Sequence, residues 1–186
     1  ALGRLSAAEP LLVQALEMSQ RLYKGDHRAV ANRLHDLGWL RYQMGRIAEA
    51  EPLLVQALEM SQRMIKGDHQ LVALCMNDLA LVRQALGRAA EAETMHRQTL
   101  EMRRRLFPGD NPEIALSLNN VGSALEAQGR SAEAETMYAQ SLEMYQRLFK
   151  GDHPRVAMDL GNVASTRQAL GRAAEEVGAV DAALDE

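Results

Sequence analysis

The sequence predicts an all-α protein made of antiparallel helix pairs that repeat along the chain. The first observation is a fixed period of 42 residues between glycines. We call the residues at equivalent positions of successive periods a column, and the glycines form two columns: Gly25, Gly67, Gly109 and Gly151 in one, and Gly3, Gly45, Gly87, Gly129 and Gly171 in the other. The second is that Gly3–His27 and Gly45–His69 differ at only five positions. The third is the helical spacing of apolar residues between these glycines. A period of roughly 20 to 50 residues is typical of a repeat array rather than of a domain with one central core.

The period divides the 186 residues into about four and a half units of a single array. We expect a partial unit in residues 1–25, full units at about 26–67, 68–109 and 110–151, and a last unit in 152–186. Two helices per unit give about nine helices. The closing stretch "GRAAEEVGAVDAALDE" has Glu176 where the other units have alanine, so it predicts a degenerate last helix or a cap.

An apolar stripe predicts the first helix of each unit. In residues 28–44, Val30, Leu34 and Leu37 recur at helical spacing and are followed by Gly38. The Gly38 column contains only small residues, which allow a neighbouring helix to approach closely. Its other members are Ala80, Gly122 and Ala164. We expect the glycine of each Gly-Arg pair, Gly171 included, to end this helix, because glycine tolerates a left-handed backbone.

A second stripe predicts the second helix of each unit. In residues 46–66 it consists of Ala50, Leu54, Ala57, Leu58 and Met64. Pro52 falls in the first turns, where the missing N–H costs least. Leu5–Tyr23 is the equivalent second helix without its first helix. Its exposed apolar face predicts either upstream sequence or contact with another molecule.

The recurring "KGDH" segments admit two interpretations, a metal site or a helix boundary. The segments are Lys24–His27, Lys66–His69 and Lys150–His153, with "PGDN" at Pro108–Asn111. Histidines one unit apart are separated by at least a helix packing distance of roughly 8–10 Å. Zinc requires its ligand nitrogens at about 2 Å from one ion, so these histidines cannot share a metal. We therefore interpret the aspartate or histidine as an N-cap of the following helix.

The composition excludes several classes of function. A net charge of −4 gives no electrostatic reason to expect nucleic acid or an anionic membrane as partner. No apolar stretch approaches the roughly 18 residues of a membrane span. The single cysteine, Cys75, excludes an intramolecular disulfide and fits a reducing, cytoplasmic compartment. Its column contains Arg33 and Asp159, so we expect it near the surface.

Several columns in phase resemble a known family. The segment Leu118–Pro154, "LNNVGSALEAQGRSAEAETMYAQSLEMYQRLFKGDHP", is similar to tetratricopeptide repeats of the long, 42-residue variety found in kinesin light chain. The shared features are small residues in the Gly38 column, a helix break at the Gly-Arg pair, and the sequence "GDHP". Small residues also occupy a second column, at Ala8, Ala50, Ala92 and Ala134. The resemblance covers roughly residues 1–176. It implies a right-handed superhelical solenoid in which the first helices line a concave groove that binds extended peptides or partner helices, without catalysis or a cofactor.

One column departs from the family pattern. The aromatic residue that often follows the small position is replaced by Arg41, Arg83, Leu125 and Arg167. We expect these arginines to lay their aliphatic stems on the core and to send the guanidinium to a glutamate or to solvent.

The non-core face of the first helices carries the candidate binding residues. On this face the residue type at a given column differs from unit to unit. Columns that do not vary are explained by packing, so the variable columns are the ones free to serve binding. The candidates are Asn32, His35, Asp36, Trp39, Tyr42, Asn77, Asp78, Leu81, Gln84, Asn119, Asn120, Ser123, Glu126 and Asn162.

Two features of this face suggest peptide contact, and each has a structural alternative. The Asn119–Asn120 pair matches an asparagine pair that grips peptide backbone in similar arrays, because an amide both donates and accepts; hydrogen bonding within or between units is the alternative. His35, Trp39 and Tyr42 share one helical face. Trp39, the only tryptophan, suits an anchor for an apolar side chain, and packing against a neighbouring unit is the alternative.

These observations predict a protein-interaction module. Asp36, Asp78 and Glu126 on the candidate face, without lysine or arginine among the candidates, favour partners that are neutral to basic. The second hypothesis is self-association through the ends of the array, giving a homo-oligomer by end-to-end stacking or exchange of a terminal helix. An enzyme is a distant third, because the sequence has no phosphate-binding glycine loop, no metal-ligand cluster and no convergent nucleophile and base.

Overall fold

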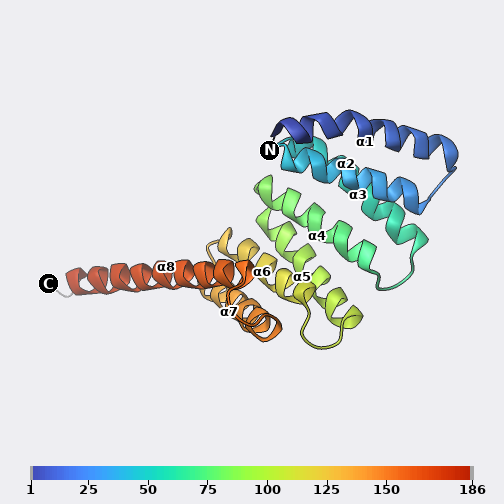
Figure 1. Ribbon diagram of the computed structural model, residues 1–186. Helices are drawn as coiled ribbons and strands as arrows, with labels where there is room; N and C mark the ends of the chain where they lie inside the picture. The colour runs from blue at the N-terminus through green and yellow to red at the C-terminus, as the bar shows by residue number, and fades with distance from the viewer. Residues whose placement is uncertain (1, 185–186) are drawn as a thin grey trace. The chain divides into compact units, whose positions relative to one another are not determined.

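The protein is all-α, as the sequence predicts (Figure 1). The structure is a computed structural model that describes the backbone of residues 2–184 and the side chains of residues 4–172. Its described part contains eight helices, which are α1 (Leu2–Leu22), α2 (Arg28–Gln43), α3 (Ile47–Met64), α4 (Gln70–Ala85), α5 (Ala89–Leu106), α6 (Pro112–Glu126), α7 (Ser131–Leu148) and α8 (Pro154–Leu184).

The helices form two compact units. The first unit, Ala1–Leu106, contains α1 to α5, and the second, Phe107–Glu186, contains α6 to α8. Within each unit every helix packs on the next one along the chain. The predicted helix pairs are α2 with α3, α4 with α5, and α6 with α7.

The "GDH" segments are helix boundaries, which confirms that interpretation. The histidine or asparagine, rather than the aspartate, accepts a hydrogen bond from the backbone N–H two residues further on. The bonds run to His27 Nδ1 (3.1 Å), His69 Nδ1 (3.0 Å), Asn111 Oδ1 (2.8 Å) and His153 Nδ1 (3.2 Å). The preceding glycines Gly25, Gly67, Gly109 and Gly151 all have positive φ, which turns the chain between the helices.

The aspartate of each of the first three segments closes its helix pair. It accepts two hydrogen bonds from an arginine 37 residues later, at the end of the second helix. The three links are Arg63 to Asp26, Arg105 to Asp68, and Arg147 to Asp110. In each, the hydrogen bonds from the guanidinium lower the pKa of the carboxyl group. Each link therefore ties the loop before a first helix to the end of its own second helix.

At the small column the two helices of a pair lie in close contact, as predicted. A Cβ atom at Gly38 would lie 2.9 Å from Leu54 Cγ, and one at Gly122 would lie 2.9 Å from two ring atoms of Tyr138. Both large side chains are buried against the glycine opposite them. A glycine on the first helix thus makes room for a large residue on the second.

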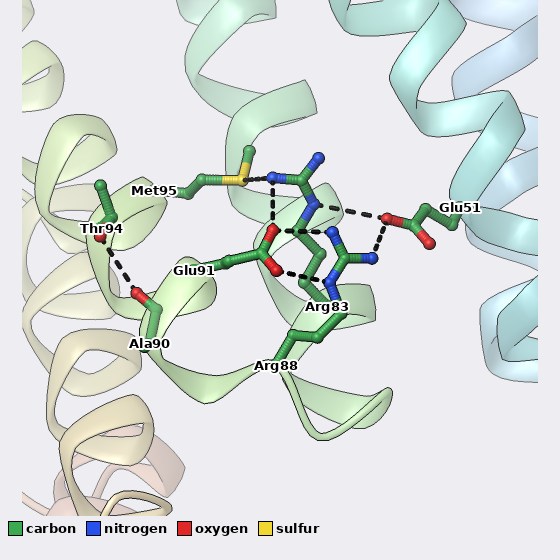
Figure 2. Close-up of polar contacts among 7 residues, drawn as sticks. All are labelled: Glu51, Arg83, Arg88, Ala90, Glu91, Thr94 and Met95. Carbon is green, nitrogen blue, oxygen red and sulfur yellow. Dashed lines mark hydrogen bonds and ion pairs between the residues drawn. The ribbon is translucent and has the colours of Figure 1, made fainter.

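Arginine–glutamate clusters join consecutive helix pairs (Figure 2). Arg88, after the glycine that ends α4, donates two hydrogen bonds of 2.7 Å to Glu91 in α5 and one of 2.6 Å to Glu51 in α3. Arg83 lies 3.4 Å from both glutamates and contacts Met95 Sδ at 3.3 Å. Arg41, Arg46, Glu9 and Glu49 repeat the arrangement one period earlier. The expectation that the arginine column reaches a glutamate is confirmed for Arg41, for Arg83 and for Arg167, whose Nε donates to Glu135 at 2.6 Å.

Two expectations about the last unit and Cys75 are wrong. The helix does not end at Gly171: α8 is one continuous helix, which gives eight helices in the described part instead of about nine. Gly171 is not among the glycines with positive φ, so it does not turn the chain. The Glu176 side chain lies outside the described residues. Cys75 is fully buried, and burial raises the pKa of its thiol to about 11.

The N-cap role of His69 can be tested with a matched pair of variants. We expect His69→Ala to lower the free energy of unfolding by about 1 kcal/mol, because the Leu71 N–H loses its acceptor. His69→Asn should stay close to the parent, since Asn111 caps α6 with the same geometry. Urea unfolding followed by far-ultraviolet circular dichroism measures both. Equal losses in the two variants would contradict the cap assignment.

The close contact at Gly122 predicts a different sensitivity at two glycines. Gly122→Ala should lower the free energy of unfolding by about 1–3 kcal/mol, because the new methyl group pushes α6 away from Tyr138. Gly161→Ala is the control: apart from its chain neighbours and the adjacent backbone of α8 itself, no atom lies within 4 Å of its Cβ position. That change should be neutral or stabilise by up to about 1 kcal/mol through helix propensity. A harmless Gly122→Ala in the same urea experiment would refute the packing argument.

Candidate functional site

Nine of the predicted site residues lie together on α2 and α4, and we call this surface the α2–α4 face. Its members are Asn32, His35, Asp36, Trp39, Tyr42, Asn77, Asp78, Leu81 and Gln84. The two helices contact each other directly, although they belong to different helix pairs. The face therefore lies within the first compact unit, Ala1–Leu106, and both of its helices are the first members of their helix pairs.

A buried polar network occupies the middle of the α2–α4 face. His35 Nε2 lies 2.7 Å from Asp78 Oδ2, and Asn77 Nδ2 donates to Asp78 Oδ1 at 3.0 Å. All three residues are buried. Both oxygens of the Asp78 carboxylate are thus hydrogen-bonded, as a buried charge requires. The network joins α2 to α4.

His35 carries a positive charge at neutral pH in this network. Burial opposes the charge, but the neighbouring carboxylates of Asp36 and Asp78 outweigh it and raise the pKa of His35 to about 9. Asp36 Oδ1 lies 3.8 Å from His35 Nδ1, and Asp36 Oδ2 accepts a 2.8 Å hydrogen bond from Arg33. Two cationic side chains therefore offset the two carboxylates of this face.

Aromatic residues form the accessible edge of the face. Trp39 and Tyr42 stack with ring centroids 5.0 Å apart and planes inclined by 24°. Both are half-buried, as are Asn32, Asp36, Leu81 and Gln84. The stack presents aromatic surface next to the buried network.

The remaining predicted residues lie on the second unit. Asn119 and Asn120 are buried, and Asn119 Nδ2 donates to Asp159 Oδ1 of α8 at 2.6 Å. Ser123 and Asn162 are half-buried, and the exposed Glu126 accepts a 2.9 Å hydrogen bond from the Tyr138 hydroxyl. Asn119 thus makes an inter-helix contact, the structural alternative considered for it from the sequence.

Two polar residues outside the predicted set are fully buried. Asp159 is fully buried, and desolvation raises the pKa of its carboxyl group. Arg33 in the same column suggests a surface position, yet the small residues Cys75 and Ser117 of that column are fully buried as well. Those small residues are the signal in the sequence that this column faces a neighbouring helix.

His96 is the second such residue, and it lies in α5. It is fully buried, and neither ring nitrogen has a hydrogen-bond partner among the described residues. Burial, with help from Arg103, lowers the pKa of His96 to about 4. The imidazole is therefore neutral at physiological pH, and His96 acts as a packing residue of the core.

The part of the chain that the structure describes contains neither a metal-ligand cluster nor a membrane-spanning helix. Within that part of the chain, no three side chains of histidine, cysteine, aspartate or glutamate gather closely enough to hold a metal ion. No helix there combines the length and the apolar character needed to cross a membrane.

Helix pairs of one period, linked by the same ion pairs and caps, define a helical repeat protein. Models described as tetratricopeptide repeat match residues 1–63, 113–185 and 72–113. The chain belongs to the tetratricopeptide repeat family, as its resemblance indicated, and such arrays are scaffolds for protein–protein interaction. A search of curated proteins finds no match.

Solved structures with a similar fold include two kinesin-light-chain-like proteins. One is a Podosopora anserina protein described as a putative kinesin light chain with nearly identical TPR-like repeats, with TM-score 0.79, 21% identity, and coverage of 96% of this chain and 85% of that one. Another is BtubC (BKLC) from P. vanneervenii, with TM-score 0.81, 25% identity, and coverage of 97% and 72%. A third is a Rap protein complexed with competence and sporulation factor, with TM-score 0.73, 18% identity, and coverage of 97% and 48%.

The His35 network predicts a loss of stability at alkaline pH. The pKa of His35 is raised in the folded protein, so its contribution is fully present below the ordinary value of 6.5 and is lost as the pH rises toward about 9. We expect a decrease on the order of 2 kcal/mol in the free energy of unfolding across this interval. Urea unfolding at a series of pH values measures it.

Other members of the His35 column supply the control. His35→Asn places at this position the residue that occupies positions 77 and 119 of the same column. Its amide can donate to Asp78 but does not titrate, so the loss between pH 6.5 and about 9 should disappear. A parent protein as stable at pH 9 as at pH 6.5 would refute the assignment of charge to His35.

Proposed function

We propose that the α2–α4 face binds an extended peptide or a segment of a partner protein, with Trp39 and Tyr42 as the anchor. The single observation that carries this proposal is the half-buried aromatic stack beside a buried polar network. Aromatic side chains held in place give up little conformational entropy on binding, and they dominate the energetics of many interfaces.

The buried network supports the anchor rather than contacting the partner. His35, Asn77 and Asp78 satisfy one another and hold α2 against α4, so the position of Trp39 relative to α4 is fixed before binding. The half-buried Asn32, Leu81 and Gln84 are the residues we assign to direct contact. This divides the predicted set into residues that build the surface and residues that touch the ligand.

Charge favours a neutral ligand on this face. Asp36 is paired with Arg33, and Asp78 is paired with the cationic His35, so neither carboxylate is left to attract a basic side chain. On the second unit, Glu126 is exposed and is our candidate for contact with a basic residue, together with Asn120, Ser123 and Asn162. The proposed partners therefore range from neutral to basic.

A structural relative supports a peptide as the ligand class. The Rap protein, which shares this fold, has been crystallised in a complex with competence and sporulation factor. At 18% identity this likeness establishes the fold alone, so a peptide as ligand of this chain is our proposal.

Trp39 provides both the test and its readout. Because it is the only tryptophan, its fluorescence reports directly on ligand arrival at the α2–α4 face. Peptides selected from a random library should change this fluorescence, and titration gives the dissociation constant. In a competition assay with a labelled peptide, Trp39→Ala and Tyr42→Ala should each weaken binding by about tenfold or more, as expected for central aromatic anchors.

The control variant is Leu86→Ala. Leu86 is exposed and lies at the C-cap of α4, outside the α2–α4 face, so its removal should leave the affinity unchanged. Asn120→Ala tests the second unit in the same assay. Unchanged affinity in Trp39→Ala and Tyr42→Ala, with circular dichroism showing an intact fold, would rule out this face as the binding surface.

A further inference from the structure

His96 in α5 is a buried imidazole whose polar atoms the fold leaves unsatisfied. It is fully buried, and neither of its ring nitrogens has a hydrogen-bond partner among the described residues. A neutral imidazole offers one donor and one acceptor, and burying such groups without partners costs free energy. Leucine would avoid this cost, and it occupies the same column at Leu12 and Leu54. Packing alone therefore does not account for a histidine at this position.

The position of His96 gives the imidazole little freedom to find a partner. Its counterpart in the next helix pair is Tyr138, and a Cβ atom at Gly122 would lie 2.9 Å from the Tyr138 ring. In the α4–α5 pair the column of Gly122 is filled by Ala80, which is fully buried. The Tyr138 hydroxyl donates to Glu126 at 2.9 Å. The shorter side chain of His96 makes no bond of this kind within the described part of the chain.

The charged groups that act on His96 come from both helices of its pair, and neither favours a proton strongly. Asp78 in α4 attracts a positive charge, but its two carboxylate oxygens are already hydrogen-bonded to His35 and Asn77. Arg103, later in α5, is also buried and repels a positive charge. Burial and Arg103 together outweigh Asp78 and lower the pKa of His96 to about 4.

A proton on His96 is therefore incompatible with the closed α4–α5 pair. An imidazolium has two N–H donors, which need acceptors that the pair does not provide and that water provides once the helices separate. The folded pKa of His96 lies below the ordinary value of 6.5. Its contribution to stability is thus present above pH 6.5 and is lost as the pH falls through about 4.

We propose that His96 makes the α4–α5 helix pair an acid-sensitive switch, which opens when the imidazole takes up a proton. Each pair of a repeat array is held only by its neighbours, so one pair can open without unfolding the whole chain. Opening would displace Asn77 and Asp78, which lie on α4, and would dismantle the buried network of the α2–α4 face. The inference goes beyond the proposed peptide binding and does not rest on it.

The two buried histidines near Asp78 respond to pH in opposite directions. His35 loses its charge as the pH rises toward about 9, whereas His96 gains a charge as the pH falls toward about 4. Each change removes a contribution to folding, so the combined contribution of the two residues is largest near their common ordinary pKa of 6.5. The acid side of this dependence belongs to α5 and the alkaline side to α2.

The variant His96→Leu tests the switch, because leucine fills this position elsewhere in the chain and does not titrate. Urea unfolding at about pH 7.5 and pH 5 gives the ratio of folded to unfolded protein. Between these values the ratio of the parent should fall about thirtyfold further than that of the variant. Amide hydrogen exchange should locate the change: the protection of α4 and α5 should fall in the parent and persist in His96→Leu.

The double variant Ala80→Gly/His96→Leu is the matched control for packing. It reproduces the contact of Gly38 with Leu54 in the α2–α3 pair, so it relieves any crowding of leucine against the Ala80 methyl group. Each variant is compared with itself at two pH values, so a constant cost of the substitution cancels. This variant should show the same reduced acid sensitivity as His96→Leu.

A direct titration of the parent needs no variant that folds differently. In NMR spectra of protein with 13C-labelled histidine, the His96 ring should remain neutral well below pH 6.5. A His96 ring that takes up its proton near pH 6.5 would overturn the proposal. Equal losses of stability or of protection in the parent and in both variants would overturn it as well. Peptide binding at pH 7.5 is measured separately, so either proposal can fail without the other.

Discussion

The close contact between a small residue on each first helix and a large residue on its second helix is the constraint on which the structure depends. At Gly38 and Gly122 there is no room for even a methyl group, and Leu54 and Tyr138 fill the space. This contact sets how near the two helices of a pair lie. The Asp–Arg link at the ends of each pair and the Arg–Glu clusters between pairs occur at equivalent positions of successive repeats.

The fold could be predicted largely because its determinants are local and repeated. Glycines with positive φ, capping side chains and helical stripes each act within a few residues, and four copies of the pattern reinforce one another. The continuity of α8 could not be predicted in this way. Gly171 matches its column but does not have positive φ, and the sequence after it departs from the other second helices at the small position, where Glu176 replaces alanine.

The candidate site could be predicted only in part, for a related reason. Helical spacing puts His35, Trp39 and Tyr42 on one face, but it does not indicate that His35 contacts Asp78. That contact joins residues 43 positions apart and depends on how two first helices lie against each other. The sequence gives conflicting signals about the burial of Cys75 and Asp159, because Arg33 in their column suggests contact with solvent while the small residue Ser117 suggests packing. A buried carboxylate next to Asn119 shows that a polar column can face a neighbouring helix.

The spacing of the ion pairs has a consequence for how such a protein can evolve. The Asp–Arg links span 37 residues, and the Arg–Glu contacts between pairs span 32 or 37, all less than one period of 42 residues. Unequal recombination that inserts or removes one whole period would reproduce both kinds of link at every new junction. The polar contacts between first helices, such as that of His35 with Asp78, would be replaced by contacts between new combinations of residues. Gene duplication could therefore lengthen the scaffold without breaking the links between its helices, while it changes which residues lie on the face that we propose binds partners.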